Sequence, residues 1–257
     1  MATEAPALSR LTVLAGRDKS GRPEARGVDF APGGITALLG PTGSGKSRFL
    51  ADIESLADND TPSGRRILLD GAVPDPDRRF ELQGRLVAQL TQNMNFVLDL
   101  EVERFIRMHA ESRGAADPEA VAREVVAAAN ALAGEPFAPH AQLTQLSGGQ
   151  SRALMIADAA LLSWSPVLLI DEIENAGVDK GRALDLLVKS DKIVVIATHD
   201  PVLALSAHRR LVFENGAVRA ALERTAAEEA LLERLTAQEE EFSRLRERLR
   251  RGETVGE

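Results

Sequence analysis

The sequence predicts an α/β protein with a mostly parallel sheet, and three features of its pattern point to this fold class. Short apolar runs that end in turn residues alternate with longer segments of helical periodicity along the 257 residues. Three runs, residues 34–40, 165–171 and 192–198, are continuously apolar, as strands buried on both faces are. The first run leads through a glycine-rich stretch directly into a helical pattern.

Composition limits the classes of function. With 44% hydrophobic residues the chain can bury one large core, and without cysteine it has no disulfide, thiolate zinc site or cysteine nucleophile. A formal net charge of -8 argues against a nucleic-acid partner, because phosphate backbones attract basic surfaces. The N-terminus lacks the basic segment followed by an apolar run that marks a secretory signal. No run of apolar residues approaches the about 20 that a membrane span needs. We therefore expect a cytoplasmic protein that does not itself insert into a membrane.

The middle of the chain changes from strand to helix patterns. Residues 61–79 are rich in Pro, Gly and Asp around one apolar run and predict a β-hairpin with its loops. The following helical pattern stops at Gly114, and a second one has Asp117 as N-cap, Pro118 in the first helical position and Gly134 past its end. We expect a helical subdomain inserted between strands, from about residue 93 to between residues 145 and 162.

The segment after Ala220 predicts one long amphipathic helix. Thr225 and Glu228 have the spacing of a capping box. Residues that alternate four and three apart, as in a coiled-coil seam, then follow at Leu231, Leu235, Gln238, Phe242, Leu245 and Leu249. Two interpretations stay open: a helix packed on its own domain, and a helix for dimerisation or for docking a partner.

The stretch GPTGSGKS, residues 40–47, has the spacing and the strand–loop–helix context of a P-loop. Its glycines let backbone N–H groups converge on a phosphate, and the start of the helix adds about half an elementary positive charge. Lys46 would then reach the β- and γ-phosphates of a nucleotide, and the Ser47 hydroxyl would bind Mg²⁺.

Two further apolar strands end in side chains suited to phosphate hydrolysis. Asp171 ends one strand, where it would hold Mg²⁺ through water, and Glu172 would orient or deprotonate the attacking water. His199 follows the other strand and would hydrogen-bond the γ-phosphate, whereas we assign His109, His140 and His208 to structural or surface positions.

These motifs, in this order and together with LSGGQ at residues 146–150, resemble the ATP-binding cassette (ABC) ATPase family over about residues 8–218. The resemblance implies a P-loop NTPase core with an antiparallel β region and an inserted helical subdomain. It also implies hydrolysis of Mg-ATP at the interface of a head-to-tail dimer. At that interface, Ser147 and the Gly149 backbone would contact the γ-phosphate of ATP held by a second subunit. Because the chain carries one set of motifs, a homodimer is the simplest completion.

The resemblance gives a full set of expected site residues. Of the two glutamines Gln89 and Gln92, spacing favours Gln92 as the residue that binds Mg²⁺, and Gln89 as part of a strand. The residues expected to contact the nucleotide are Gly40, Pro41, Thr42, Gly43, Ser44, Gly45, Lys46, Ser47, Arg48, Gln92, Leu146, Ser147, Gly148, Gly149, Gln150 and Asp171. The expected catalytic residues are Glu172, His199 and Lys46, and the expected Mg²⁺ ligands are Ser47, Gln92 and Asp171.

The sequence departs from the family pattern at several positions. The aromatic residue that stacks on adenine is missing near Arg17, whose guanidinium plane would take its place. Arg48 replaces a threonine after Ser47, Asp158 stands where many members carry Arg, and Asp179 is displaced by one residue in the loop after Glu172. These changes suggest a divergent branch.

The resemblance divides the chain into a nucleotide-binding domain at residues 1–222 and a tail at residues 223–257. It favours the energising ATP-binding subunit of an ABC transporter, held at the inner face of a membrane by a permease subunit. The alternative is a soluble ABC ATPase without a transport role that drives a partner complex, with the terminal helix as its handle.

Overall fold

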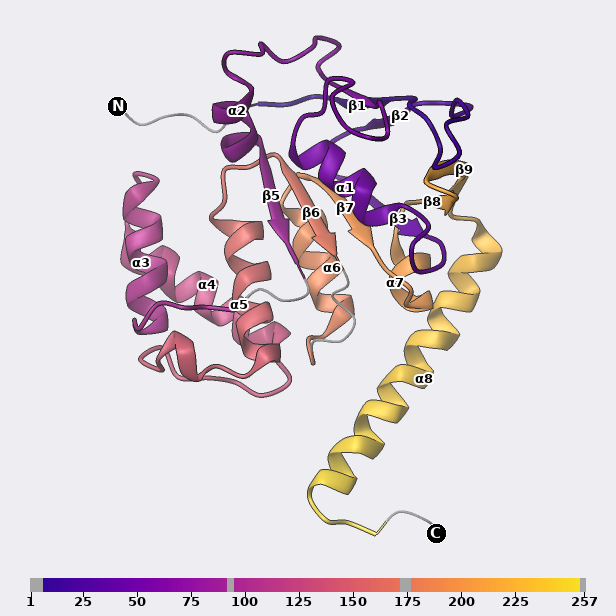
Figure 1. Ribbon diagram of the computed structural model, residues 1–257. Coiled ribbons are helices and arrows are strands. Elements are labelled where there is room, and N and C mark those ends of the chain that lie inside the picture. The colour runs from indigo at the N-terminus through magenta and orange to yellow at the C-terminus, as the bar shows by residue number, and fades with distance from the viewer. Residues whose placement is uncertain (1–6, 92–94, 172–176, 255–257) are drawn as a thin grey trace.

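The computed structural model describes residues 7–91, 95–171 and 177–254, and it confirms the α/β fold class (Figure 1). The strands are β1 Leu11–Leu14, β2 Val28–Phe30, β3 Ile35–Leu39, β4 Arg66–Leu69, β5 Val87–Leu90, β6 Val167–Asp171, β7 Ile193–Ala197, β8 Arg209–Glu214 and β9 Ala217–Glu223. The helices are α1 Lys46–Glu54, α2 Arg79–Leu86, α3 Val102–Ser112, α4 Pro118–Leu132, α5 Gly148–Leu161, α6 Lys180–Lys189, α7 Pro201–Ser206 and α8 Ala226–Arg250, with a 3₁₀ turn at Leu143–Gln145.

The larger sheet has the strand order β5-β6-β7-β3-β8-β9, in which only β9 runs antiparallel to its neighbour. The three continuously apolar runs form β3, β6 and β7 at its centre, as predicted. Both faces of these strands are covered: one packs against α1, and the other packs against α5, α6 and α7. This explains why the strands show no alternation of apolar and polar residues.

The smaller sheet has the order β2-β1-β4 and is antiparallel, and α1 lies between it and the larger sheet. The predicted hairpin at residues 61–79 is wrong, because β4 pairs with β1 instead of with a following strand. Pro74 and Pro76 explain the difference, since neither has the N–H group that a returning strand would donate. Buried Ile67 of β4 lies opposite buried Val13 of β1, so the pairing also closes the core.

The helices α3, α4 and α5 follow β5 and have an apolar core of their own (Figure 1). The predicted helix ends are confirmed: Asp117 accepts a hydrogen bond from the Ala120 N–H, Pro118 is the first residue of α4, and Gly114 has a φ of 68° after α3. His109 of α3 pairs with Asp158 of α5 at 2.7 Å between Nδ1 and Oδ1. Asp158 therefore has a partner inside this group of helices.

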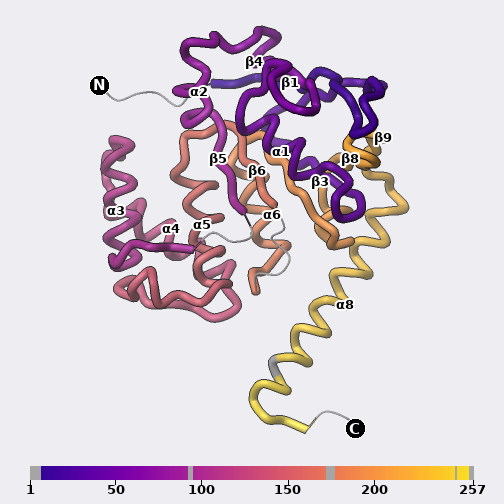
Figure 2. The backbone as a smooth tube through the Cα atoms, in the orientation of Figure 1, coloured from indigo at the N-terminus to yellow at the C-terminus, as the bar shows by residue number. Residues whose placement is uncertain are grey.

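The long helix α8 packs on the body through its first half, and in its second half Glu239 and Arg250 form ion pairs with Lys180 and Glu135 (Figures 1 and 2). Its capping box is present, with the Thr225 N–H donating to Glu228 at 2.9 Å. Its first half packs against α7, with Leu232 and Leu235 half-buried. Phe242 and Leu249 in its second half are 60% and 53% exposed. Packing on its own domain is thus confirmed for the first half. In the part of the chain that the structure describes, no helix is long and apolar enough to cross a membrane.

Candidate nucleotide-binding site

The site lies at the carboxyl edge of the larger sheet. Because β3, β6 and β7 run parallel, Gly40, Asp171 and His199 follow or end their strands at this one edge. The hydroxyl of Ser47, at the start of α1, donates to Oδ2 of Asp171 at 3.4 Å across 124 residues of sequence. The fold therefore brings together two of the three residues expected to bind Mg²⁺.

The P-loop between β3 and α1 needs its glycines for both conformation and space. Gly40 and Gly45 have φ angles of 146° and 111°, which side chains rarely adopt. A Cβ on Gly40 would lie 2.6 Å from the Phe213 carbonyl oxygen, and one on Gly45 would lie 2.7 Å from Cα of Gly216. The end of β8 and the β8–β9 turn are therefore packed directly against the loop, and they leave no room for a side chain at position 40 or 45.

Polar groups in and beside the loop fit a magnesium-bound nucleotide. The Lys46 ammonium lies over the loop and donates to the Gly40 and Pro41 carbonyl oxygens at 2.7 and 3.2 Å. The buried Ser44 hydroxyl has no hydrogen-bond partner among the described residues. Ser47 and Asp171 supply the oxygen ligands that Mg²⁺ prefers. Thr42, Gly43 and Arg48 are exposed, as the groups that receive a ligand must be.

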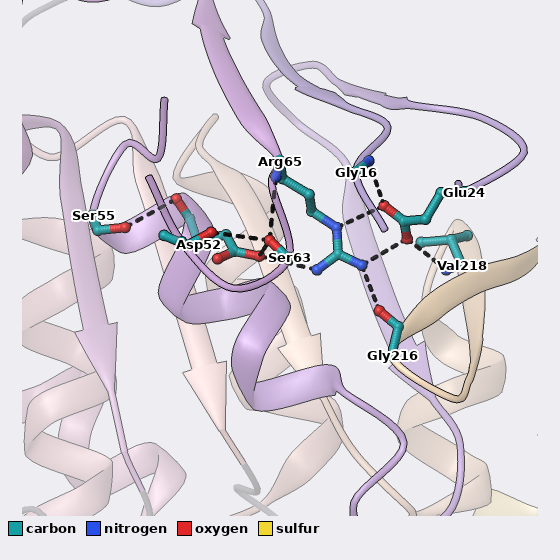
Figure 3. Close-up of polar contacts among 9 residues, drawn as sticks. Gly16, Glu24, Asp52, Ser55, Ser63, Arg65, Gly216 and Val218 are labelled. Atoms are coloured by element: carbon teal, nitrogen blue, oxygen red, sulfur yellow. Dashed lines mark hydrogen bonds and ion pairs between the residues drawn. The ribbon is translucent and has the colours of Figure 1, made fainter. Parts of the chain in front are cut away.

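A buried hydrogen-bond network around Arg65 is connected to the P-loop through Gly216 (Figure 3). The guanidinium donates to both carboxylate oxygens of Glu24 at 2.6 and 2.9 Å, and to Oδ2 of Asp52, on α1, at 3.0 Å. It also donates to the Gly216 carbonyl oxygen at 2.6 Å, and the Gly216 N–H donates to the Ser44 carbonyl oxygen in the P-loop at 2.7 Å. The network thus joins the loop before β2, α1 and the β8–β9 turn.

Replacement of Arg65 by Met is expected to lower the free energy of unfolding by about 3–5 kcal/mol, measured by urea denaturation. The substitution leaves the buried carboxylates of Glu24 and Asp52 without their cation, and their side chains are only 2% and 0% exposed. The matched control is Arg22→Met, which breaks the ion pair between the exposed Arg22 side chain and Asp18 and should cost at most about 1 kcal/mol. Equal small losses for both variants would contradict this account of the network.

LSGGQ forms the exposed start of α5. Ser147 is the N-cap: its Oγ accepts from the Gln150 N–H at 3.2 Å, and its N–H donates to Oε1 of Gln150 at 2.9 Å. Leu146 packs on the core of α3, α4 and α5, whereas Ser147 and Gly148 are exposed and Gly149 is half-buried. Figure 1 shows the start of α5 near α3 and α4 and away from β3 and α1, so this helix start is not adjacent to the P-loop of the same chain.

The remaining predicted residues differ in what the structure says of them. Gln92 and Glu172 lie outside the described residues, so their roles stay predictions. Gln89 is in β5, as predicted. His199 is exposed and directly precedes Asp200, the N-cap of α7. Arg17 is also exposed, and its backbone N–H donates to the Ser63 carbonyl oxygen at 2.6 Å.

Sequence reasoning missed an ion cluster beside the site. Lys180, the first residue of α6, pairs with Asp200, the N-cap of α7, and with Glu239 of α8. The N-cap role of Asp200 had a visible signal, because Pro201 follows it in the first helical position. Lys180 had none, since its partners lie 20 and 59 residues away.

Comparison with known proteins adds one family and several relatives. The model of the ABC transporter family matches residues 26–175. An uncharacterized ABC transporter ATP-binding protein of Methanocaldococcus jannaschii is 49% identical over 249 residues, which are 96% of this chain and 95% of that protein. The lipoprotein-releasing system ATP-binding protein LolD of Anaeromyxobacter dehalogenans is 31% identical over 217 residues, covering 77% of this chain and 85% of LolD.

Solved structures share the fold. The protein cbiO1 from Clostridium perfringens, part of the ABC transporter complex cbiONQ, aligns with a TM-score of 0.64 over 94% of this chain and 100% of that one, at 23% identity. A dimeric ATP-binding cassette in a post-hydrolysis state bound to ADP and Pi aligns with a TM-score of 0.62 over 84% of this chain and 99% of that one, at 22% identity. At these identities the likeness concerns the fold.

Proposed function

The chain belongs to the ABC transporter family of ATP-binding proteins, and from this premise we propose that it is the ATP-hydrolysing subunit that energises a membrane transporter. As a member of the family it binds ATP and hydrolyses it with a P-loop. The finer proposal concerns which residues act, how two copies assemble and what the ATPase drives.

We assign the chemistry to residues at the carboxyl edge of the larger sheet. Lys46 and the backbone N–H groups of the P-loop hold the β- and γ-phosphates. Ser47, Asp171 and Gln92 hold Mg²⁺, which neutralises charge that develops on the phosphates. Glu172 orients and deprotonates the attacking water, and His199 holds the γ-phosphate in register. The observation that carries this assignment is the 3.4 Å contact between Ser47 Oγ and Asp171 Oδ2.

We propose that two copies pack head to tail and share two ATP molecules. In support, Ser147 and Gly148 form an exposed helix start, and such a start binds anions through its free N–H groups. The start of α5 does not lie beside the P-loop of its own chain, so we infer that its phosphate comes from another chain. A second copy of the chain supplies that phosphate, and the arrangement closes as a two-fold dimer.

Ser147→Arg tests this shared site. In the Glu172→Gln background we expect it to leave the Kd of the monomer for ATP within about twofold and to abolish the ATP-dependent dimer, because the added side chain fills the space for the γ-phosphate. Ser147 is exposed, so the variant should fold, at a cost of about 1 kcal/mol for the lost cap. Ser112→Arg adds the same charge at the exposed end of α3 and should dimerise normally. A full ATP-dependent dimer with Ser147→Arg would refute the shared site.

Transport is the role that the relatives favour. The relatives above are named as ATP-binding proteins of transport or release systems. A permease subunit, docked on the helices α3 to α5, would hold the pair of cassettes at the inner face of a membrane. ATP would then join the two copies, and hydrolysis would separate them and move the permease.

A further inference from the structure

Lys180 occupies a position that is electrostatically unfavourable for a lysine. It is the first residue of α6, and its ammonium also contacts Asp200 at the start of α7. A positive charge at the start of a helix is opposed by the helix dipole, and here it meets the starts of two helices. Its side chain is only 18% exposed, so the ammonium requires charged partners in place of water.

Two carboxylates from different elements supply that compensation. Asp200 binds Lys180 through Oδ2, while its Oδ1 accepts from the N–H groups of Val202 and Leu203 in α7. Glu239 of α8 binds the same ammonium at 2.7 Å. Burial tends to lower the pKa of Lys180, but the hydrogen bonds to Asp200 and Glu239 outweigh it and raise this pKa. Lys180 is therefore charged at neutral pH, and the same contact lowers the pKa of Asp200 against the effect of its burial.

The cluster lies next to the predicted catalytic residues in the chain. Asp200 directly follows His199, and Lys180 directly follows Asp179 in the loop that begins with Glu172. Lys180 thus joins the start of α6 to Asp200, the residue that follows the expected catalytic His199. It is far less able to affect ATP binding, which depends on the P-loop.

Through Glu239, the contacts of Lys180 depend on the position of α8. The ion pair between Arg210 and Glu228, at 2.6 Å, fixes the beginning of this helix. Glu239 makes a contact with the body about three turns further on, just before the exposed stretch that contains Phe242 and Leu249. A shift of α8 would therefore change the contacts of Lys180.

We propose that Lys180 is a positioning residue for ATP hydrolysis, which sets the His199 loop according to where α8 places Glu239. This inference rests on the proposed ATPase function and adds to it an input from α8.

The experiment is a double-mutant cycle on the ATPase activity of the full chain. Lys180→Met and Glu239→Gln should each lower kcat by about 2- to 30-fold, with KM for ATP within about twofold, because Lys180 does not belong to the phosphate-binding loop. Combined, the two changes should lower kcat no further than Lys180→Met alone. Lys180→Arg, which keeps the charge, should restore at least half of the lost activity.

The matched control is Glu228→Gln, which removes another ion pair between α8 and the body without touching the His199 loop. It should leave kcat within about twofold of wild type. A fall equal to that of Glu239→Gln would show that loosening α8 in any way has the same effect, and it would overturn the role of Lys180. Unchanged kcat in Lys180→Met would also overturn it, while leaving the proposed function intact. Absence of ATP hydrolysis in the wild-type protein would instead refute the proposed function.

Discussion

Glu172→Gln is expected to lower kcat for ATP hydrolysis by about 100- to 10,000-fold, the range that a positioned general base contributes. Glutamine has nearly the same size but cannot take a proton from the attacking water. ATP binding should be retained, because the P-loop and the Ser47–Asp171 pair are untouched. Steady-state phosphate release measures kcat, and equilibrium binding of a fluorescent ATP analogue measures affinity.

Glu124→Gln is the matched control for this result. Glu124 is an exposed residue of α4, and its change removes the same charge away from the sheet edge. It should leave kcat within about twofold. Turnover by Glu172→Gln at the wild-type rate would remove Glu172 as the base and would leave the carboxyl edge without its expected proton acceptor.

Lys46→Ala is expected to raise the Kd for ATP by at least about 30-fold. The ammonium lies over the P-loop and is the cation expected to meet the β- and γ-phosphates. Losing one partner of a desolvated charge pair costs about 2 kcal/mol or more, and each 1.4 kcal/mol is about tenfold in Kd. Isothermal titration calorimetry of the monomeric protein would measure the change.

The control for charge is Lys189→Ala, at the exposed end of α6. It should bind ATP as the wild type does. If Lys46→Ala binds within twofold of wild type, the assignment of residues 40–47 as the phosphate-binding loop is wrong, whatever the sequence pattern suggests.

The sheet and the P-loop could be predicted because their signals are local. The central strands are continuously apolar, and glycines at positions 40, 43 and 45 coincide with positive φ angles. A strand that ends in Asp171 lies near Ser47 because parallel strands share their carboxyl edge. Both arguments need only the parallel sheet that the apolar runs predict.

Contacts between distant segments could not be predicted in the same way. Arg65 meets Glu24 across 41 residues and Gly216 across 151, and nothing around Arg65 in the sequence indicates either partner. The hairpin at residues 61–79 was wrong for a related reason, since the partner of β4 is β1, which precedes it by about 50 residues. Strand composition predicts that a strand exists but does not say which strand it pairs with.

The LSGGQ stretch shows which part of a site cannot be predicted from one chain alone. Its local structure follows from its sequence, because Ser147 and Gln150 form a reciprocal cap at the start of α5. Its proposed ligand does not follow from its sequence, since the start of α5 lies away from the P-loop of the same chain. In the dimer that we propose, a second copy of the chain makes both motifs parts of one site.

Sedimentation velocity of the Glu172→Gln protein, with and without Mg-ATP, tests that claim most directly. The account predicts a monomer without nucleotide and a dimer with Mg-ATP, because ATP bound between the two copies persists when hydrolysis is blocked. A protein that remains monomeric at high concentration in saturating Mg-ATP would contradict it.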